Sequence, residues 1–367
     1  YQWVTIPLAL HGVVVKQDGN VVNVCIGEDP SDPVIYINDL LPHLAKDQSA
    51  KPLGSAFHAE GLNLLMGSRH YPGLEGGDAI RLNVLALLNE KYGITEEDFL
   101  SADLSAVPAG KARDVGLDRS LIAAYGHDDR VCAYPSITAM IDADEKLHTT
   151  MCLLVDKEET GSDGVTGMQS SLITDLITEI AKALGGNEAT VRANSKCLSS
   201  DVTAIYDPNF PDVYEHRNSA LLGCGVGMCK FTGSRGKGGT SDASAELVAW
   251  VRRCLNEAGV VWQTCELGKI DVGGGGTVAK FMSATHMGMA SKPSLGAVME
   301  NPGAPGASTA MASKFSWPSY TPTISPTLKV LAVQVNVPMV YLPSSVLAPS
   351  APTVITLIDS SEAGFPF

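Results

Sequence analysis

The chain places carboxylates at three points where short apolar runs end. They lie in YGHDDRVCAY (125–134), VDKEETGSDG (155–164) and SSDVTAIYDPNFPD (199–212). A hydrolytic metal site needs ligands that converge from several segments, because one segment cannot surround an ion. Each segment alone is as compatible with a solvated loop as with a ligand. Three acidic turns in one region favour a shared site for divalent metal ions.

The second segment contains two adjacent glutamates, Glu158 and Glu159, directly after the apolar run 152–155. An isolated Glu-Glu pair is usually part of an ordinary solvated loop. At the end of a strand, however, successive side chains point in opposite directions. The two neighbours could therefore perform two different tasks, if the rest of the chain supplies a site.

Other kinds of chemistry have little support. The glycine-rich GSRGKGGT (233–240) lacks the spacing of a phosphate-binding loop. The sequence contains no G-x-S-x-G motif, and no cysteine lies beside a plausible histidine partner, so a covalent nucleophile is not indicated. The eight cysteines form no Cys-x-x-Cys pair. We interpret them as buried free thiols in a reducing cytosol.

Composition limits the class of protein. A chain of 367 residues is too long for one typical core, so two domains are expected. With 45% hydrophobic and 18% charged residues it is typical of globular, soluble proteins. A net charge of −14 argues against a nucleic-acid partner. No uninterrupted apolar run reaches the ~18–20 residues of a membrane span and no basic leader is visible, so we expect a cytoplasmic protein that does not bind membranes.

The residue composition and the pattern of apolar residues change twice along the chain. Residues 1–107 are rich in β-branched runs separated by turns such as DGN (18–20), and contain one helical pattern at 78–93. Residues 108–289 alternate strands with helices, which predicts an α/β architecture. Residues 290–367 hold 11 of the 21 prolines and six charged residues, and their fold is not predicted.

Within these regions the pattern predicts a strand at 148–155 and helices at 171–186 and 241–259, the last with Ser241 or Asp242 as N-cap. Pro135 follows HDDR, where it could kink a helix. The residues expected to face inward on the three helices are Ile80, Val84, Leu87 and Leu88, then Leu172, Leu176, Ile180 and Leu184, then Leu247, Val251, Cys254 and Leu255.

The motifs GKARDVGLDRSLIAAYGHDDRVCAY, LLVDKEETGSDGVTGMQS, NSKCLSSDVTAIYDPNFPD and TGSRGKGGTSDASAE resemble the aminopeptidase I/aspartyl aminopeptidase family of dinuclear zinc metallopeptidases, most closely its bacterial members. The resemblance covers residues 1 to about 289. It implies an α/β catalytic domain with a central mixed β-sheet flanked by helices. It also implies that 1–107 is the smaller β-rich inserted domain, which mediates dimerisation.

The resemblance assigns roles to single residues. Asp128 matches the carboxylate that bridges two zinc ions, Glu159 and Asp201 match terminal ligands on different ions, and Glu158 matches the general base. Co²⁺ or Mn²⁺ could replace zinc. Gly274 and Gly275, in DVGGGGTV, fit a loop that comes close to the substrate, although a mobile turn explains them equally well. His43 lies where the family brings a histidine from a neighbouring subunit, although a structural histidine is an equally good interpretation.

The same resemblance implies peptide substrates and an assembly of dimers into a tetrahedral dodecamer. Two histidine ligands of the family have no counterpart in the sequence. One belongs to an H-x-D motif before the inserted domain, and the other lies after His286, where this chain has no histidine. Three explanations stay open: a truncated chain, a shifted reading frame after about 289, or loss of catalysis. We therefore expect a zinc aminopeptidase, with a catalytically silent assembly or binding subunit as the alternative.

Overall fold

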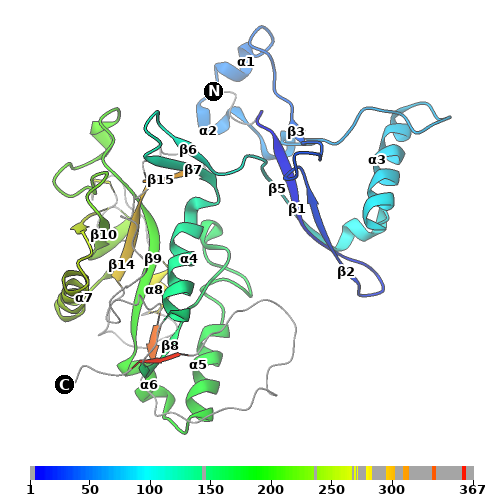
Figure 1. Cartoon of the computed structure of the whole chain (residues 1–367). Helices are drawn as coiled ribbons and strands as arrows, with labels where there is room; N and C mark the ends of the chain where they lie inside the picture. The colour runs from blue at the N-terminus through cyan, green and yellow to red at the C-terminus, as the bar shows by residue number, and fades with distance from the viewer. Residues whose placement is uncertain are drawn as a thin grey trace. The chain divides into compact units, whose positions relative to one another are not determined.

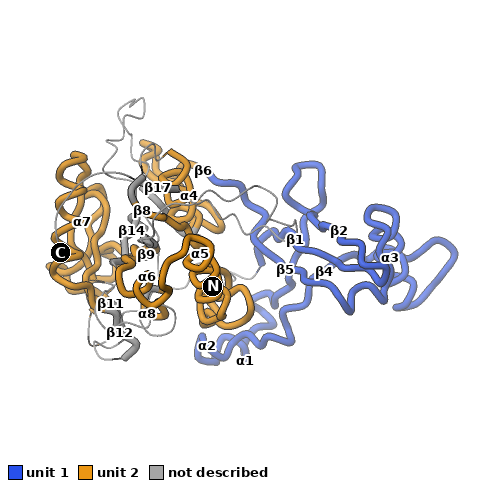
Figure 2. The backbone as a smooth tube through the Cα atoms, turned by 90° about the horizontal axis from the view of Figure 1, so that it is seen from below, with its two compact units in different colours: residues 1–112 blue, residues 113–367 orange. Residues whose placement is uncertain are grey.

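In a computed structural model, the chain forms two compact units, residues 1–112 and 113–367 (Figure 2). The structure describes residues 5–142, 146–234, 238–266, 268–269, 271, 278–282, 295–301, 309–313, 333–335 and 358–360. The sequence analysis placed the first boundary after 107 and set 290–367 apart as a third segment. In the structure, the described strands beyond 290 pair with strands of the second unit.

Unit 1 is built on an antiparallel sheet in the order β2-β1-β5, with β3 paired to β4. Its described strands are β1 (Leu8–Val15), β2 (Val21–Ile26), β3 (Tyr36–Ile37), β4 (Leu64–Leu65) and β5 (Ala102–Pro108). Its described helices are α1 (Lys46–Ser49), α2 (Leu53–Ala56), α3 (Gly77–Tyr92) and the 3-10 turns η1 (Ala59–Gly61) and η2 (Glu97–Ser101).

The core of unit 1 lies on one face of this sheet. Leu10 and Val14 of β1 and Val24 of β2 are buried there and pack with Leu88 of α3. Alternate residues of a strand point to opposite faces, so His11 and Cys25 lie on the other face. The predicted helix at 78–93 is confirmed, but Leu87, expected inward, is 58% exposed. Leu87 and Leu88 are about 100° apart around the helix, and Leu88 takes the place against the sheet.

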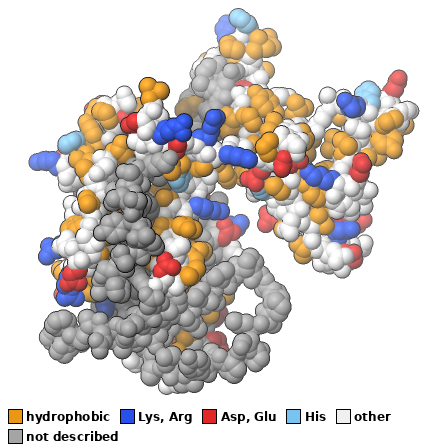
Figure 3. Space-filling view, viewed as in Figure 1, with side chains coloured by type: hydrophobic (Ala, Val, Ile, Leu, Met, Phe, Trp, Pro, Cys, Tyr) orange, Lys and Arg blue, Asp and Glu red, His pale blue; other side chains and the backbone are white. Residues whose placement is uncertain are grey.

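Many apolar side chains remain exposed in the segment 40–74 of unit 1, and Figure 3 shows hydrophobic side chains on the surface of this unit. The most exposed leucines of the segment are Leu41, Leu44, Leu53 and Leu65. Apolar side chains exposed along one segment are candidates for contact with another molecule.

Unit 2 contains a mixed sheet of seven described strands in the order β13-β10-β14-β9-β16-β8-β17. β9 runs parallel to β14 and antiparallel to β16. These strands are β8 (Lys146–Met151), β9 (Lys196–Ala204), β10 (Val226–Cys229), β13 (Trp262–Thr264), β14 (Leu295–Asn301), β16 (Val333–Val335) and β17 (Ile358–Ser360). Two smaller sheets pair β15 (Thr309–Ser313) with β7 (Leu121–Tyr125) and β6 (Arg113–Val115), and β11 (Phe231–Ser234) with β12 (Gly238–Asp242).

Helices flank this sheet on both faces (Figure 1). Cys197 of β9 packs in the cluster of Ile177 from α5, whereas its neighbour Leu198 packs against Leu247 of α7. Because adjacent side chains of a strand point to opposite faces, α5 and α7 cover opposite sides. The described helices of unit 2 are α4 (His127–Ile141), α5 (Leu172–Ala183), α6 (Glu188–Asn194), α7 (Ala245–Glu257), α8 (Ala279–Phe281) and the 3-10 turns η3 (Glu158–Thr160) and η4 (Pro211–Val213). The predicted α/β class with a mixed central sheet is confirmed.

Two details of the predicted helices were wrong. On α5, Leu172 is 50% exposed, whereas Ile173 and Ile177 are buried beside the expected Ile180, and the expected Leu176 and Leu184 are partly buried against the same core. Helix α7 begins at Ala245, and its N-cap is Ser244, whose side chain accepts a hydrogen bond from the Leu247 N–H. Ser241 and Asp242 instead end β12. Pro135 lies inside helix α4.

The described part of the chain contains no helix that is both long and apolar enough to span a membrane. Its cysteines form no disulfide. Cys25 and Cys224 are exposed, which differs from the expectation that the thiols are buried.

Candidate active site

The acidic segment 156–169 folds into a tight loop rather than an extended strand end. The predicted strand at 148–155 ends at Met151, because β8 pairs no further. The loop is closed by a hydrogen bond from the Asp156 N–H to the Thr166 carbonyl and by one from the Gln169 N–H to the Ser162 carbonyl. Ser162 is 2% exposed and occupies the centre of the loop. The backbone of this segment is therefore fixed by its own contacts.

Glu158 and Glu159 form the first two positions of the 3-10 turn η3 at the tip of this loop. Lys157, just before them, adopts the left-handed conformation with φ of 65°, which turns the chain sharply into η3. Both glutamates are exposed. In a 3-10 turn of three residues, adjacent side chains diverge by about 120°. At a strand end the two glutamate side chains would point in opposite directions. In η3 they diverge by the smaller angle of about 120°, which still allows them to perform separate tasks.

Two neighbouring acids have structural partners in the loop. Asp163 accepts a hydrogen bond from the Gln169 side chain, 3.0 Å from Nε2, and so braces the loop. The backbone N–H of Lys157 holds the pKa of Asp156 below its usual value, and the Lys157 ammonium lies 3.1 Å from the Asp156 carboxylate. Among the acids of this loop, Glu158 and Glu159 are the two that were predicted to act as general base and zinc ligand.

Asp128 lies in the first turn of α4, two residues after Gly126, and it is exposed. Gly126 has φ of 71° and turns the chain from β7 into the helix. A carboxylate at a helix N-terminus interacts favourably with the helix dipole, which explains an acid here even without a metal ion. Helix α4 packs against β9, the strand that holds Asp201.

Asp201 is half-buried on β9, between β14 and the strands at the other side of the sheet. Its parity places it on the sheet face of Cys197, which is the face that α5 covers. One carboxylate oxygen, Oδ1, accepts a hydrogen bond of 2.7 Å from the N–H of Val202. Asp201 thus lies on the side of the sheet that α5 covers. The acidic loop 156–169 leads into the same helix.

The four predicted acids do not form a compact apo cluster. Among the residues that the structure describes, the group whose ligand atoms all lie within 4.8 Å of one another is His11, Cys25 and Glu28. A dinuclear site does not require such mutual contact. Two ions ~3.5–4 Å apart place terminal ligands of opposite ions roughly 5–7 Å from each other. Carboxylate oxygens are among the ligands that zinc accepts in proteins, so these three elements of unit 2 could contribute ligands to a zinc site.

The remaining predicted residues are His43, Gly274 and Gly275. His43 is exposed on a turn just before α1 in unit 1. Gly274 and Gly275 fall outside the described residues. The sequence analysis did not single out Glu266, a half-buried carboxylate after β13 whose Oε2 lies 3.8 Å from Sγ of the buried Cys229. Burial raises the pKa of Glu266, and no sequence motif marks that position.

Comparison with known proteins gives the class of this fold and site. A family model described as "Aminopeptidase I zinc metalloprotease (M18)" matches residues 1–291. The chain is 50% identical over 291 residues to the "Probable M18 family aminopeptidase 1" of Clostridium acetobutylicum, a match that covers 78% of this chain and 63% of that protein. The chain thus spans 63% of the length of this curated relative.

Solved structures agree. The crystal structure of an M18 family aminopeptidase from Thermotoga maritima matches with a TM-score of 0.76 and 41% identity, over 85% of this chain and 68% of that one. The S. cerevesiae mApe1 dodecamer shares the fold, with a TM-score of 0.56 and 19% identity over 85% of this chain and 66% of that one. The fold of the chain is therefore the one seen in M18 family aminopeptidases. The chain belongs to the aminopeptidase I (M18) family, as the resemblance of its motifs predicted.

Proposed function

We propose that this chain is the zinc-binding part of an aminopeptidase that removes the N-terminal residue from peptides. The observation that supports this most strongly is membership of a zinc metalloprotease family over residues 1–291, a span that includes all four predicted acids. Unit 2 presents these acids on α4, η3 and β9, and α4 packs directly against β9.

The ligand roles follow from the family resemblance and suit the local structure. Asp128 would bridge two zinc ions, while Glu159 and Asp201 would each bind one of them; Co²⁺ or Mn²⁺ are possible substitutes. The hydrogen bond between the Val202 N–H and Asp201 Oδ1 fixes the orientation of that carboxylate. When bound, zinc ions supply positive charge that polarises a water molecule and the scissile carbonyl.

Glu158 would act as the general base. As the neighbour of a ligand on η3, it diverges from Glu159 and can take a proton from the polarised water, then deliver it to the leaving amine. The closed loop 156–169 would hold both glutamates in place. Gly274 and Gly275 would let the backbone approach the substrate, and His43 would act in the active site of a neighbouring copy.

We further propose that the protein is a cytoplasmic homo-oligomer in which unit 1 mediates contacts between copies. The exposed leucines of segment 40–74 support this, because an apolar surface of that kind is stabilised when it is covered. A tetrahedral dodecamer of dimers is the assembly expected from the family. Analytical ultracentrifugation of the chain tests this part of the proposal.

The enzymatic part is tested by hydrolysis of aminoacyl-p-nitroanilides with and without added Zn²⁺, Co²⁺ or Mn²⁺. We expect metal-dependent release of nitroaniline that Glu158→Gln abolishes, because the amide cannot accept the proton. Zinc binding should survive this substitution, since Glu158 is not a ligand, whereas Glu159→Gln should weaken binding as well as activity.

Glu179→Gln is the matched control. It removes an exposed glutamate from α5, where Glu179 pairs with Lys182 at 2.9 Å, and it should leave activity unchanged. No hydrolysis with any of the three metals would reject the enzyme and favour a catalytically silent subunit. Full activity of Glu158→Gln would reject the assigned base.

A further inference from the structure

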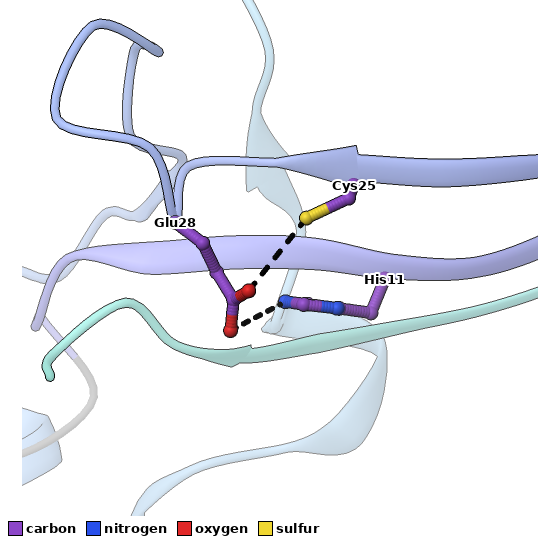
Figure 4. Close-up of side chains that lie close together, drawn as sticks. All are labelled: His11, Cys25 and Glu28. Carbon is purple, nitrogen blue, oxygen red and sulfur yellow. Dashed lines mark hydrogen bonds and ion pairs between the residues drawn. The ribbon is translucent and has the colours of Figure 1, made fainter. Parts of the chain in front are cut away.

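Unit 1 holds a second group of possible metal ligands, His11, Cys25 and Glu28, whose ligand atoms all lie within 4.8 Å of one another (Figure 4). Nε2 of His11 lies 3.2 Å from Oε1 of Glu28. Sγ of Cys25 lies 3.7 Å from Oε2 of the same carboxylate. The three side chains converge on one point, from β1, from β2 and from the turn that follows β2.

The backbone places these residues firmly. His11 and Cys25 are direct partners in the antiparallel pair of β1 and β2, so their side chains stand next to each other on one face of the sheet. The hydroxyl of Tyr92 donates a hydrogen bond of 2.7 Å to the Cys25 carbonyl and accepts one from the Cys25 N–H at 3.4 Å. The position of Cys25 is therefore fixed from outside the hairpin.

A glycine brings the third residue into the group. Gly27 has φ of 104°, and a Cβ at this position would lie 3.0 Å from Cα of Ala9 and 3.1 Å from the Leu8 carbonyl oxygen. Its N–H donates to the Asp32 carboxylate at 3.2 Å. This turn reverses the chain directly after β2, so that Glu28 comes back over His11 and Cys25.

One buried atom of the group has a carboxylate close to it but makes no hydrogen bond. Nε2 of His11 is buried and makes no hydrogen bond, although the Glu28 carboxylate is close. A buried polar nitrogen without a hydrogen bond is costly, and an imidazole nitrogen in this position is a good metal ligand.

We propose that His11, Cys25 and Glu28 bind one zinc ion that is separate from the metal site of unit 2. Bond lengths of ~2.0–2.3 Å in a tetrahedral site would place the imidazole nitrogen about 3.3 Å and the sulfur about 3.5 Å from the carboxylate oxygen. The observed separations are similar, 3.2 Å from Nε2 to Oε1 and 3.7 Å from Sγ to Oε2. They reach the two different oxygens of the Glu28 carboxylate, so a rotation of that carboxylate would bring one oxygen to the ion. Three protein ligands leave a fourth position for water, and the exposure of Cys25 and Glu28 gives solvent access.

Zinc is favoured over calcium or magnesium, because the group combines thiolate, imidazole and carboxylate rather than oxygen ligands alone. Without an ion the Cys25 thiol donates a hydrogen bond to Glu28. Binding would release this proton to solvent and replace the hydrogen bond by a Zn–S bond. The ion would then connect β1, β2 and the turn of Glu28.

The test uses the full chain and reads out Cys25 itself, so that metal binding in unit 2 cannot imitate a positive result. The protein is treated with iodoacetamide, with and without ZnCl₂, and alkylation at each cysteine is followed by mass spectrometry. We expect zinc to slow alkylation of Cys25 at least tenfold. Cys224, the other exposed cysteine, is the internal control and should react at an unchanged rate.

Cobalt titration provides the second measurement. Co²⁺ bound to a thiolate gives a sulfur-to-metal charge-transfer band in the near ultraviolet, which a site made of carboxylates cannot give. The band should be present in the wild-type chain and in Cys224→Ser, and absent in Cys25→Ser. It should weaken in His11→Ala and Glu28→Gln, with circular dichroism confirming that each variant is folded. Equal alkylation of Cys25 with and without zinc, or a cobalt band that persists in Cys25→Ser, would overturn the proposal.

Discussion

Gly167 is the position where one added methyl group tests the acidic loop most directly. It is buried, and a Cβ there would lie 2.3 Å from the Ser162 carbonyl oxygen and 2.7 Å from that of Asp163. Ordinary van der Waals contact begins near 3.4 Å, so Gly167→Ala forces the Ser162 carbonyl to move by about 1 Å. The atoms that must move belong to the backbone of the loop that holds Glu158 and Glu159.

Over-packing of this kind costs about 1–3 kcal/mol of stability. Misplacing catalytic groups by ~1 Å lowers rates by about 100-fold. For Gly167→Ala we therefore expect kcat/KM for aminoacyl-p-nitroanilides to fall about 100-fold and zinc affinity to weaken, while most of the protein stays folded at 25 °C. Steady-state kinetics, zinc titration and urea denaturation are measured on the same preparations.

The matched control is Gly110→Ala, which adds the same methyl group where nothing lies within 4 Å and no left-handed backbone is needed. It should change neither kinetics nor stability. Wild-type kcat/KM together with a wild-type unfolding midpoint for Gly167→Ala would refute the reasoning. It would mean that the loop has room for the added methyl group.

Three further predictions concern stability. Ile177→Ala removes a side chain that is 1% exposed in the core between α5 and the sheet and should cost about 2–5 kcal/mol in urea denaturation, whereas Leu172→Ala, at a position that is 50% exposed, should cost about 0.5 kcal/mol or less. Ser244→Ala removes the N-cap of α7 and should cost about 1 kcal/mol, while an Asp242→Ala variant should show no loss of helix capping. Burial raises the pKa of Cys197 from 9.0 to about 12, so the folded state holds a proton that the unfolded state releases. Stability should be unaffected below pH 9 and fall as the pH rises from 9 towards 12, with a shallower fall in Cys197→Ala; an identical slope in both proteins would contradict this.

The sequence predicted the existence of the main helices better than the faces they bury. In SLITDLITEI, Leu172 and Leu176 form one apolar stripe and Ile173 and Ile177 form the adjacent one. Helical periodicity fits both, and packing against the core buries Ile173 and Ile177, leaves Leu176 partly buried and leaves Leu172 exposed. The three-residue turn η3 had no sequence signal, because it depends on left-handed φ values at Lys157 and Ser162, residue types that seldom adopt them.

Two of the three residues in the ligand group of unit 1, His11 and Cys25, could have been paired from the sequence. The DGN turn at 18–20 was identified, and the hairpin closes there with the Lys16 N–H bonded to the Asn20 carbonyl. Counting outward from this turn brings His11 opposite Cys25. The return of Glu28 could not have been predicted, since it depends on the positive φ of Gly27.

The central claim is that Asp128, Glu159 and Asp201 hold a pair of zinc ions that Glu158 faces. The most direct measurement is an anomalous difference map at the zinc edge from crystals of the chain grown with zinc. In unit 2 we predict two peaks ~3.5–4 Å apart, each within ~2.2 Å of oxygens from these carboxylates. A map in which zinc binds elsewhere in unit 2, with the three carboxylates turned to solvent, would contradict the account.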